Sequence, residues 1–294
     1  MRIELAARQP FSLQQVIRSH GWPQLLPFHW ERESDALLRV ERLTTGTVVA
    51  LNFHSMENGL AVEVSDEELT DAERAELETT LDWMFGLDMD FGPFYEMARG
   101  EPKLAGVEAN ARGRVLRSAT FWEDTIKTIL TTNTAWSGTI RMNAALVAQF
   151  GDPLPAAPAM QAFPTPAAVA ASDPDTLRNI TKLGYRAPYI HELADAVAAG
   201  RLDLERLKDP AMPTAEVRKR LLAIKGVGGY AAANLLMILG RYDFIPIDSW
   251  AMNQVSQEWY GGQPVGPKEV EAAFERWEEW KGLVYWWWDW DQSG

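Results

Sequence analysis

Residues 221–250 read LLAIKGVGGYAAANLLMILGRYDFIPIDSW, and this stretch decides the fold. Its pattern predicts a short helix over Thr214–Ile224, a glycine turn, and a mostly apolar helix over Tyr230–Leu239. Glycines one residue apart allow positive φ angles and leave no side chain in front of the amides of the turn. Because bare amides at a helix N-terminus attract anions, the turn is a candidate phosphate site. It consists of Gly226, Val227, Gly228 and Gly229.

An acidic residue follows this helical hairpin. Asp248 comes after Pro246 and before an apolar-periodic segment, which is typical of a helix N-cap or of an acid in the first turn. A fixed carboxylate near a turn that binds phosphate suits chemistry beside a sugar-phosphate backbone. The spacing alone is equally satisfied by a plain helical hairpin followed by a capping Asp.

The two patterns together, LxxIxGVGxxxAxxxL and PxDxW, resemble the helix-hairpin-helix and catalytic-Asp motif of the HhH-GPD DNA glycosylases. The resemblance extends over roughly residues 10–290 and is most specific at these motifs. It implies a helix-hairpin-helix glycosylase architecture of the α+β class, mainly α with a small N-terminal antiparallel β-sheet. It also implies that Asp248 is the catalytic carboxylate, that the partner is double-stranded DNA with a damaged base, and that the protein is a monomer.

The position of Tyr230 departs from part of that family. Bifunctional relatives place a Lys four residues after the first hairpin glycine, where it forms a Schiff base. A phenol cannot form an imine, so we expect a monofunctional glycosylase without DNA-strand lyase activity. The bacterial 3-methyladenine group has an aromatic residue there, which stacks on cationic alkylated bases. Asn234 lies one turn further on the same helix face, and either binds the extruded base or is a buried amide satisfied by the backbone.

Two other segments resemble the 8-oxoguanine glycosylase group. A predicted helix over Phe121–Leu130 ends in a polar loop, and Asn133 in that loop matches the Asn that fills the space left by the flipped nucleotide. Helix is expected to resume over Arg141–Phe150. Further on, Gly-Tyr-Arg-Ala matches the segment that probes the base opposite the lesion, with Tyr185 and Arg186 in the matching positions. Locally, a capped helix–helix connection and an ordinary glycine turn would give the same patterns.

The chain is expected to have three parts. Residues 1–100 read as an antiparallel sheet subdomain, with strands near 37–43, 48–54 and 60–64, followed by an acidic helix over Asp66–Phe85. Residues 101–245 read as a helical domain that contains the hairpin at about 214–239. Residues 246–294 would supply the Asp248 helix and a Trp-rich helix over Glu269–Trp290, which we expect to be core material. Gly151–Pro166, rich in Pro and Ala, reads as a linker or long loop.

Composition and charge limit the possible functions. The 294 residues contain no Cys, which excludes disulfides, thiolate zinc sites and Cys-ligated iron–sulfur clusters. We therefore expect no cofactor and no side-chain metal site; the resemblance implies only a possible monovalent cation at the hairpin backbone, residues 224–229. No 18-residue apolar run and no signal peptide are evident, so a cytoplasmic protein without a membrane span is expected.

The net charge of −13 is unusual for a DNA-binding protein. Its distribution is uneven, because residues 1–100 carry 8 Lys and Arg against 18 Asp and Glu, whereas residues 101–245 carry 17 against 14. The region with the hairpin is thus the net-positive one, which predicts a small basic footprint. The main alternative function is a non-catalytic helix-hairpin-helix protein that binds damaged or distorted DNA. A structural or protein-interaction module is a third possibility. The sequence leaves the excised lesion open and favours an alkylated or oxidised purine.

Overall fold

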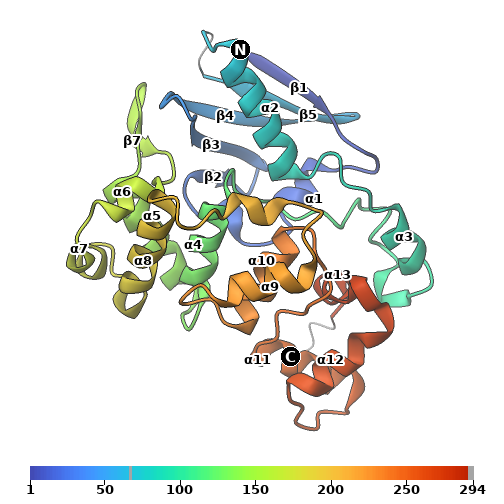
Figure 1. The fold of residues 1–294 in the computed structure, drawn as a ribbon. Helices are drawn as coiled ribbons and strands as arrows, with labels where there is room; N and C mark the ends of the chain where they lie inside the picture. The colour runs from blue at the N-terminus through green and yellow to red at the C-terminus, as the bar shows by residue number, and fades with distance from the viewer. Residues whose placement is uncertain (66–67, 291–294) are drawn as a thin grey trace. The chain divides into compact units, whose positions relative to one another are not determined.

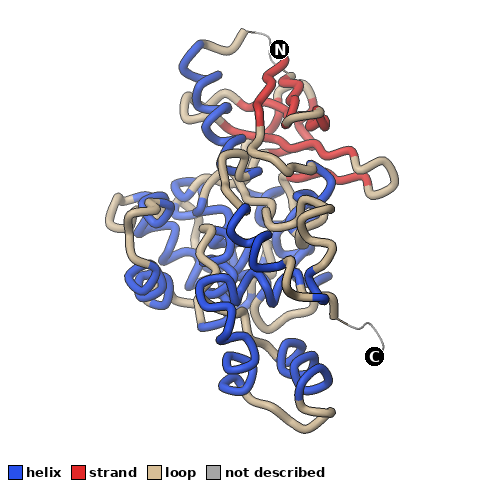
Figure 2. Tube along the Cα trace, turned by 90° about the vertical axis from the view of Figure 1, so that its right-hand side faces the viewer, coloured by secondary structure: helices blue, strands red, loops and turns tan. Residues whose placement is uncertain are grey.

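The computed structural model describes residues 1–65 and 68–290, which form two compact units. Unit 1 comprises residues 1–89 and 114–206, and unit 2 comprises residues 90–113 and 207–294. The expected class, mainly α with a small N-terminal antiparallel sheet, is confirmed (Figures 1 and 2). The three-part domain division stays a prediction. Residues 66–67, where the acidic helix was expected to begin, and the last four residues of the expected third part lie outside the described residues.

A five-stranded antiparallel sheet forms the N-terminal part of unit 1, in the order β1-β5-β4-β3-β2. The three central strands agree with the sequence pattern, and a two-residue turn, Glu57–Asn58, joins two of them one residue before the Asn58–Gly59 turn that the sequence predicts. The two edge strands were not predicted. The partner of β1 is β5, far away in the sequence, whereas β2 pairs with the next strand along the chain but has only four residues. The strands are β1 (Arg2–Ala6), β2 (Phe28–Glu31), β3 (Ala36–Arg42), β4 (Val48–Met56) and β5 (Gly59–Val64).

Helix α2 (Asp71–Phe85) lies against this sheet (Figure 1). Its first turn is fixed by a capping box, in which the side chain of Thr70 accepts from the Glu73 backbone and the Glu73 carboxylate accepts from the Thr70 backbone. The ring of Phe85 packs 5.1 Å from that of Phe53 on β4. The same apolar side of α2 buries Leu77, Leu81 and Met84. Burial of this stripe, rather than helix propensity, stabilises the subdomain.

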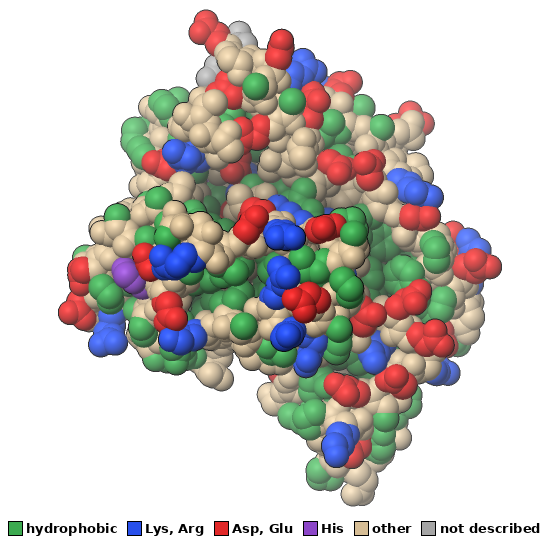
Figure 3. Space-filling view, viewed as in Figure 1, with side chains coloured by type: hydrophobic (Ala, Val, Ile, Leu, Met, Phe, Trp, Pro, Cys, Tyr) green, Lys and Arg blue, Asp and Glu red, His purple; other side chains and the backbone are tan. Residues whose placement is uncertain are grey.

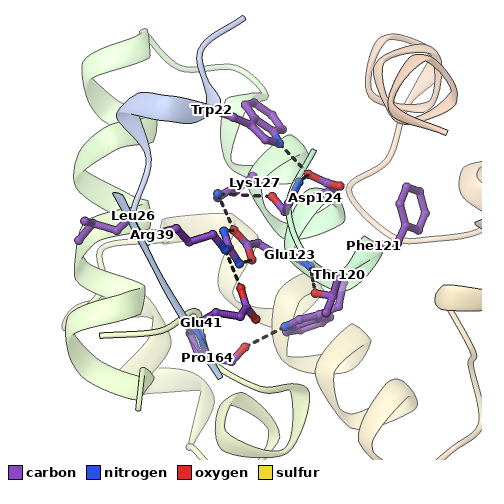
Figure 4. Close-up of polar contacts among 12 residues, drawn as sticks. Trp22, Leu26, Arg39, Glu41, Thr120, Phe121, Glu123, Asp124, Lys127 and Pro164 are labelled. Atoms are coloured by element: carbon purple, nitrogen blue, oxygen red, sulfur yellow. Dashed lines mark hydrogen bonds and ion pairs between the residues drawn. The ribbon is translucent and has the colours of Figure 1, made fainter. Parts of the chain in front are cut away.

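A buried charge network joins β3 to α4 (Phe121–Thr131), as Figure 4 shows. The Arg39 guanidinium donates two hydrogen bonds to the Glu123 carboxylate, at 3.0 and 2.7 Å, and Lys127 Nζ lies 2.6 Å from the same carboxylate. All three side chains are at most 1% exposed. Removing one partner of such a buried pair costs about 3–5 kcal/mol, because the remaining charge is left uncompensated. The network therefore fixes α4, which leads directly into the loop of Asn133.

Two other segments of unit 1 differ from the sequence prediction, the helix that ends at Phe150 and the Pro-rich segment after it. Helix α5 (Trp136–Phe150) begins five residues earlier than predicted. The segment Gly151–Pro166 is not a plain linker, because it forms a two-stranded hairpin, β6 (Pro153–Leu154) and β7 (Ala157–Gln161). Leu154 and Ala162 are buried with two residues of the large sheet in one apolar cluster, which is why the Pro-rich segment is ordered.

The remaining elements of unit 1 are short helices. They are α1 (Leu13–Ile17), η1 (Trp22–Gln24), α6 (Pro166–Ala170), α7 (Pro174–Asn179), η3 (Gly184–Arg186) and α8 (Ala187–Ala198). A 3₁₀ turn, η4 (Glu205–Lys208), lies where the chain passes from unit 1 to unit 2.

Unit 2 is helical and contains the predicted hairpin. The single Trp-rich helix expected over 269–290 is wrong: the segment divides into three pieces, with a break where Glu278 has a φ of 47°. Its expected core role is confirmed for Trp277 and Trp288, which are 5% and 7% exposed. The elements are α3 (Gly92–Ala98), η2 (Pro102–Leu104), α9 (Thr214–Leu222), α10 (Gly229–Ile238), α11 (Ser249–Trp259), α12 (Pro267–Phe274), η5 (Glu275–Trp280) and α13 (Lys281–Trp287). Across the described part of both units, no helix is long and apolar enough to cross a bilayer.

Candidate active site

The hairpin turn between α9 and α10 presents bare backbone. Gly226 has a φ of +88°, and Val227 is buried, with its N–H donating to the carbonyl of Ile224 at 3.0 Å. Gly228 and Gly229 are exposed, and a Cβ atom added at either would meet nothing within 4 Å. No side chain caps the N-terminus of α10. The first amides of this ten-residue helix therefore have no side chain in front of them, and their role as a phosphate site stays a prediction.

Basic side chains accompany the hairpin. Helix α9 carries Arg218, Lys219 and Arg220, and in Figure 3 basic side chains lie over this part of the face among acidic ones. Arg220 is paired with Glu216 at 2.8 Å, so part of this positive charge is neutralised. The basic footprint is accordingly small, and binding of a polyanion through it would depend strongly on salt.

Asp248 is the N-cap of α11, which confirms the sequence prediction. Its backbone is extended, with φ −132° and ψ −171°, and its Oδ1 atom accepts a hydrogen bond from the Ala251 N–H at 2.8 Å. The side chain is exposed. The carboxylate is thus held in one orientation by the helix that it starts, and it remains open to solvent and to a ligand.

Two tyrosines share the electrostatic environment of Asp248. Tyr230 is half-buried in the first turn of α10, and burial raises the pKa of its phenol, with a further rise from the negative charge of Asp248. Tyr285 of α13 is 5% exposed, and its pKa is raised well above the ordinary value by burial first and then by Asp248 and Tyr230. Both phenols are therefore neutral near pH 7 and can donate hydrogen bonds.

The exposed side chain of Trp250 lies next to Tyr285. Trp250 lies two residues after Asp248 and is 49% exposed. Its ring packs edge-on against Tyr285 and Trp290, with centroid separations of 6.3 and 5.8 Å. The sequence assigns only Tyr230 and Asn234 to the expected base pocket. Trp250 could have been found from the sequence, because it is the W of the PxDxW motif. Tyr285 could not, because nothing in the Trp-rich segment near the C-terminus sets it apart from its aromatic neighbours.

Asn234 is occupied within its own helix. Its Nδ2 atom donates to the backbone carbonyl of Tyr230 at 3.0 Å. This geometry favours the alternative in which the amide is satisfied by the backbone.

The three residues expected to probe the duplex all belong to unit 1, and two short loops bring them together. Asn133 has a left-handed backbone, with a φ of 47°, and its Nδ2 atom lies 3.3 Å from the Tyr185 hydroxyl. Tyr185 is 49% exposed, but Arg186 is only 6% exposed. The Arg186 guanidinium donates to the Thr132 carbonyl rather than pointing to solvent. The hairpin and Asp248, in contrast, belong to unit 2.

Within residues 1–65 and 68–290, no group of three or more His, Cys, Asp or Glu side chains is arranged to hold a metal ion.

Comparison with known proteins identifies the family. The family described as HhH-GPD superfamily base excision DNA repair protein matches residues 126–279, more than half of the chain. The chain therefore belongs to this superfamily. A DNA-3-methyladenine glycosylase of Bacillus subtilis (strain 168) is 29% identical over 167 residues, which are 56% of this chain and 54% of the relative. The matches to curated relatives cover 40% and 54% of their lengths, so the chain spans about half the length of these proteins.

Two solved structures have the same fold. A 3-methyladenine DNA glycosylase from Archaeoglobus fulgidus superposes with a TM-score of 0.75 at 22% identity, covering 98% of this chain and 97% of that one. An 8-oxoguanine glycosylase/lyase from Clostridium acetobutylicum gives a TM-score of 0.74 at 18% identity, also covering 98% and 97%. At these identities the likeness establishes the fold alone.

Proposed function

We propose that this protein is a monofunctional DNA glycosylase of base excision repair, which flips a damaged base out of a duplex and hydrolyses its N-glycosidic bond. The observation that carries the proposal is the exposed, helix-capping carboxylate of Asp248, which lies in the electrostatic surroundings of the Tyr230 and Tyr285 phenols. Membership of the base excision repair superfamily and the similarity to a named DNA-3-methyladenine glycosylase support it.

Asp248 would act on the sugar. As the C1′–N bond breaks, both bonding electrons leave with the base and the deoxyribose becomes cationic. A preoriented carboxylate stabilises this charge without having to reorganise. Water then adds to C1′ and gives up a proton, for which Asp248 is the acceptor. The products are the free base and an abasic site in an unbroken strand.

The hairpin and the loops of unit 1 would bind the duplex. The exposed amides at Gly228 and Gly229 are suited to a phosphate of the damaged strand. Asn133 would occupy the gap left by the flipped nucleotide, and Tyr185 would stack on the bases beside it. The resemblance also implies contact of Arg186 with the opposite base, but the guanidinium is buried and donates to the Thr132 carbonyl. A monovalent cation bound by the backbone carbonyls of residues 224–229 is likewise carried over from the family alone.

Tyr230 supports the monofunctional assignment. It occupies the place of the Schiff-base Lys of bifunctional relatives, and a neutral phenol has no nitrogen to form an imine. The structural neighbour from Clostridium acetobutylicum is described as an 8-oxoguanine glycosylase/lyase, and on this proposal Tyr230 is the difference that removes the lyase step.

An alkylated purine is the favoured substrate class, with an oxidised purine as the alternative. The rings of Tyr230, Tyr285 and Trp250 and the carboxylate of Asp248 make an electron-rich environment, which stabilises a positively charged base by cation–π and Coulomb attraction. A cationic alkylated base also leaves as a neutral molecule and therefore needs no general acid.

The test is a panel of duplexes, each with one defined lesion: an N-alkylated purine, 8-oxoguanine, uracil or hypoxanthine. We expect release of the alkylated purine, with strand breaks that appear only after treatment with alkali. Strand cleavage without alkali would contradict the monofunctional mechanism. Salt-sensitive binding without release of any base would favour the non-catalytic alternative.

A further inference from the structure

We infer that Arg186 is a positioning residue, which fixes Asn133 and Tyr185 as one rigid surface instead of contacting DNA itself. The inference rests on the proposed function, because it takes the loops of Asn133 and Tyr185 to face a duplex. It assigns Arg186 a role different from the one that the family resemblance implies, and every contact behind it lies within unit 1.

The first observation is the opposite exposure of two neighbouring residues. In the short 3₁₀ turn η3, Tyr185 is 49% exposed and Arg186 is 6% exposed. The Nη2 atom of Arg186 donates to the Thr132 carbonyl, and its Nη1 atom lies 3.8 Å from the Met142 sulfur. A guanidinium in this place cannot reach a base edge unless it breaks the bond to Thr132 and leaves the protein interior.

The second observation is a closed ring of contacts between two loops. The Cζ atom of Arg186 lies 4.5 Å from the centroid of the Tyr185 ring, in cation–π contact. The Tyr185 hydroxyl accepts from the Asn133 amide at 3.3 Å, and Asn133 follows Thr132, which Arg186 holds by its carbonyl. The Arg186 guanidinium thus contacts the first loop at the Thr132 carbonyl and the second loop at the aromatic ring of Tyr185. At the surface, the hydrogen bond between Asn133 and Tyr185 joins the same two loops.

These contacts between the two loops hold Asn133 and Tyr185 in place before DNA binds. Asn133 has a φ of 47°, a left-handed conformation that Asn tolerates but that an isolated loop would populate only in part. The aromatic ring of Tyr185 is half exposed, and besides Arg186 it contacts Tyr189 edge-on, with 6.3 Å between the ring centroids. Groups held in their binding geometry lose less conformational entropy when a ligand arrives. Arg186 therefore contributes to affinity through the order of its two neighbours.

The geometry also predicts which substitutions retain the role. Lys keeps one donor for the Thr132 carbonyl and loses the flat contact with the ring, since its charge is a point at the end of a flexible chain. Met fills a similar volume and keeps neither contact. The Arg186 Nε atom is buried without a hydrogen-bond partner in the described residues, so Lys removes no bond at that position.

The experiment uses duplexes with a tetrahydrofuran abasic-site analogue opposite each of the four bases, and measures dissociation constants by fluorescence anisotropy. Arg186→Met should weaken binding about tenfold, by a similar factor for all four opposite bases, and Arg186→Lys should recover part of the loss. Combined with Tyr185→Ala, Arg186→Met should add little further loss, because both changes disrupt the same surface. The salt dependence of binding should be unchanged, because a buried guanidinium releases no counterion.

Arg178 provides the matched control. It is an exposed cation on α7, in the same part of unit 1. The effect of Arg178→Met, whatever its size, should add fully to that of Tyr185→Ala. A loss in Arg186→Met confined to one opposite base, a shallower salt dependence, or full additivity with Tyr185→Ala would each overturn the inference in favour of direct contact with DNA.

Two further outcomes of the experiment are misfolding of Arg186→Met and the absence of base release by the wild-type protein. If Arg186→Met does not fold, as thermal unfolding would show, the cycle of Arg186→Lys with Tyr185→Ala decides the question by the same criterion of additivity. If the wild-type protein binds these duplexes but releases no base from any lesion, the proposed function fails while the role of Arg186 remains established by the binding data.

Discussion

The Oδ1 atom of Asp248 accepts a hydrogen bond from the Ala251 N–H at 2.8 Å, so the proposed catalytic carboxylate caps its own helix. This relationship gives one side chain two roles that different substitutions separate. Capping requires only an oxygen acceptor, whereas stabilisation of a cationic sugar requires negative charge.

Asp248→Asn should therefore leave the fold intact and abolish base release. Asn caps helices about as well as Asp, so the melting temperature should hardly change. Single-turnover release of the base should fall by about 10²-fold or more, the typical effect of removing one electrostatic group from an active site. Asp248→Ala is the control, since it should lose the same activity and also about 1 kcal/mol of stability. Full activity in Asp248→Asn would mean that the carboxylate is not the catalytic group.

Tyr230→Lys should create a chemical signature that the wild-type protein lacks. An amine at this position can attack C1′ of an abasic site and form an imine, which borohydride reduces to a stable protein–DNA adduct. We expect the adduct in Tyr230→Lys, and none in the wild-type protein or in Tyr230→Phe. Denaturing gel electrophoresis after borohydride treatment is the measurement. An adduct with the wild-type protein would show that another amine of this chain reaches the sugar.

The glycines of the hairpin should respond in opposite ways to substitution by Ala. At Gly226 the positive φ of 88° makes a Cβ unfavourable, so Gly226→Ala should destabilise the fold by about 1–2 kcal/mol. At Gly229 a Cβ meets nothing and Ala favours the helix, so Gly229→Ala should melt at the same temperature or higher. Its DNA affinity should nevertheless fall several-fold, because the methyl group occupies the surface proposed for the phosphate. Undiminished affinity in Gly229→Ala would exclude this part of the turn as a phosphate site.

Stability should fall as the pH decreases from about 6.5 to 4, partly because of His20. Burial lowers the pKa of His20 to about 4, and its Nε2 atom contacts the Leu116 carbonyl at 2.6 Å. The unfolded chain takes up this proton near pH 6.5, so the contribution is complete above pH 6.5 and is lost as the pH falls towards 4. It is on the order of 1–3 kcal/mol. Burial lowers the pKa of His29 as well, so part of the slope has a second source.

His20→Gln tests this contribution, because its amide can still donate to the Leu116 carbonyl but does not titrate. Urea unfolding at several pH values should give a flatter pH dependence for the variant between pH 4 and 6.5. If the curves of the two proteins are parallel over this range, His20 does not carry the effect.

Local patterns were sufficient for the elements whose signals lie within a few residues. The hairpin follows from its glycines and apolar spacing, the cap at Asp248 from Pro246 and the helix after it, and the central strands from alternation and the turn at Asn58. These features depend on backbone conformations that the side chains favour by themselves. The family motif is built from the same local features, and so the sequence predicted the fold class as well as the residues proposed for chemistry.

Other features depended on partners distant in the sequence. The Pro-rich segment forms a hairpin because Leu154 and Ala162 are buried with residues of the large sheet. Burial and the charge of Asp248 raise the pKa of Tyr285, which follows a break in the Trp-rich segment at Glu278, and the run of aromatic residues contains no signal for that break. Arg186 is the sharpest case. The sequence by itself determined which residues are candidates for binding and catalysis, but only the tertiary structure decided which of them face outward, because burial depends on packing against segments that no local pattern names.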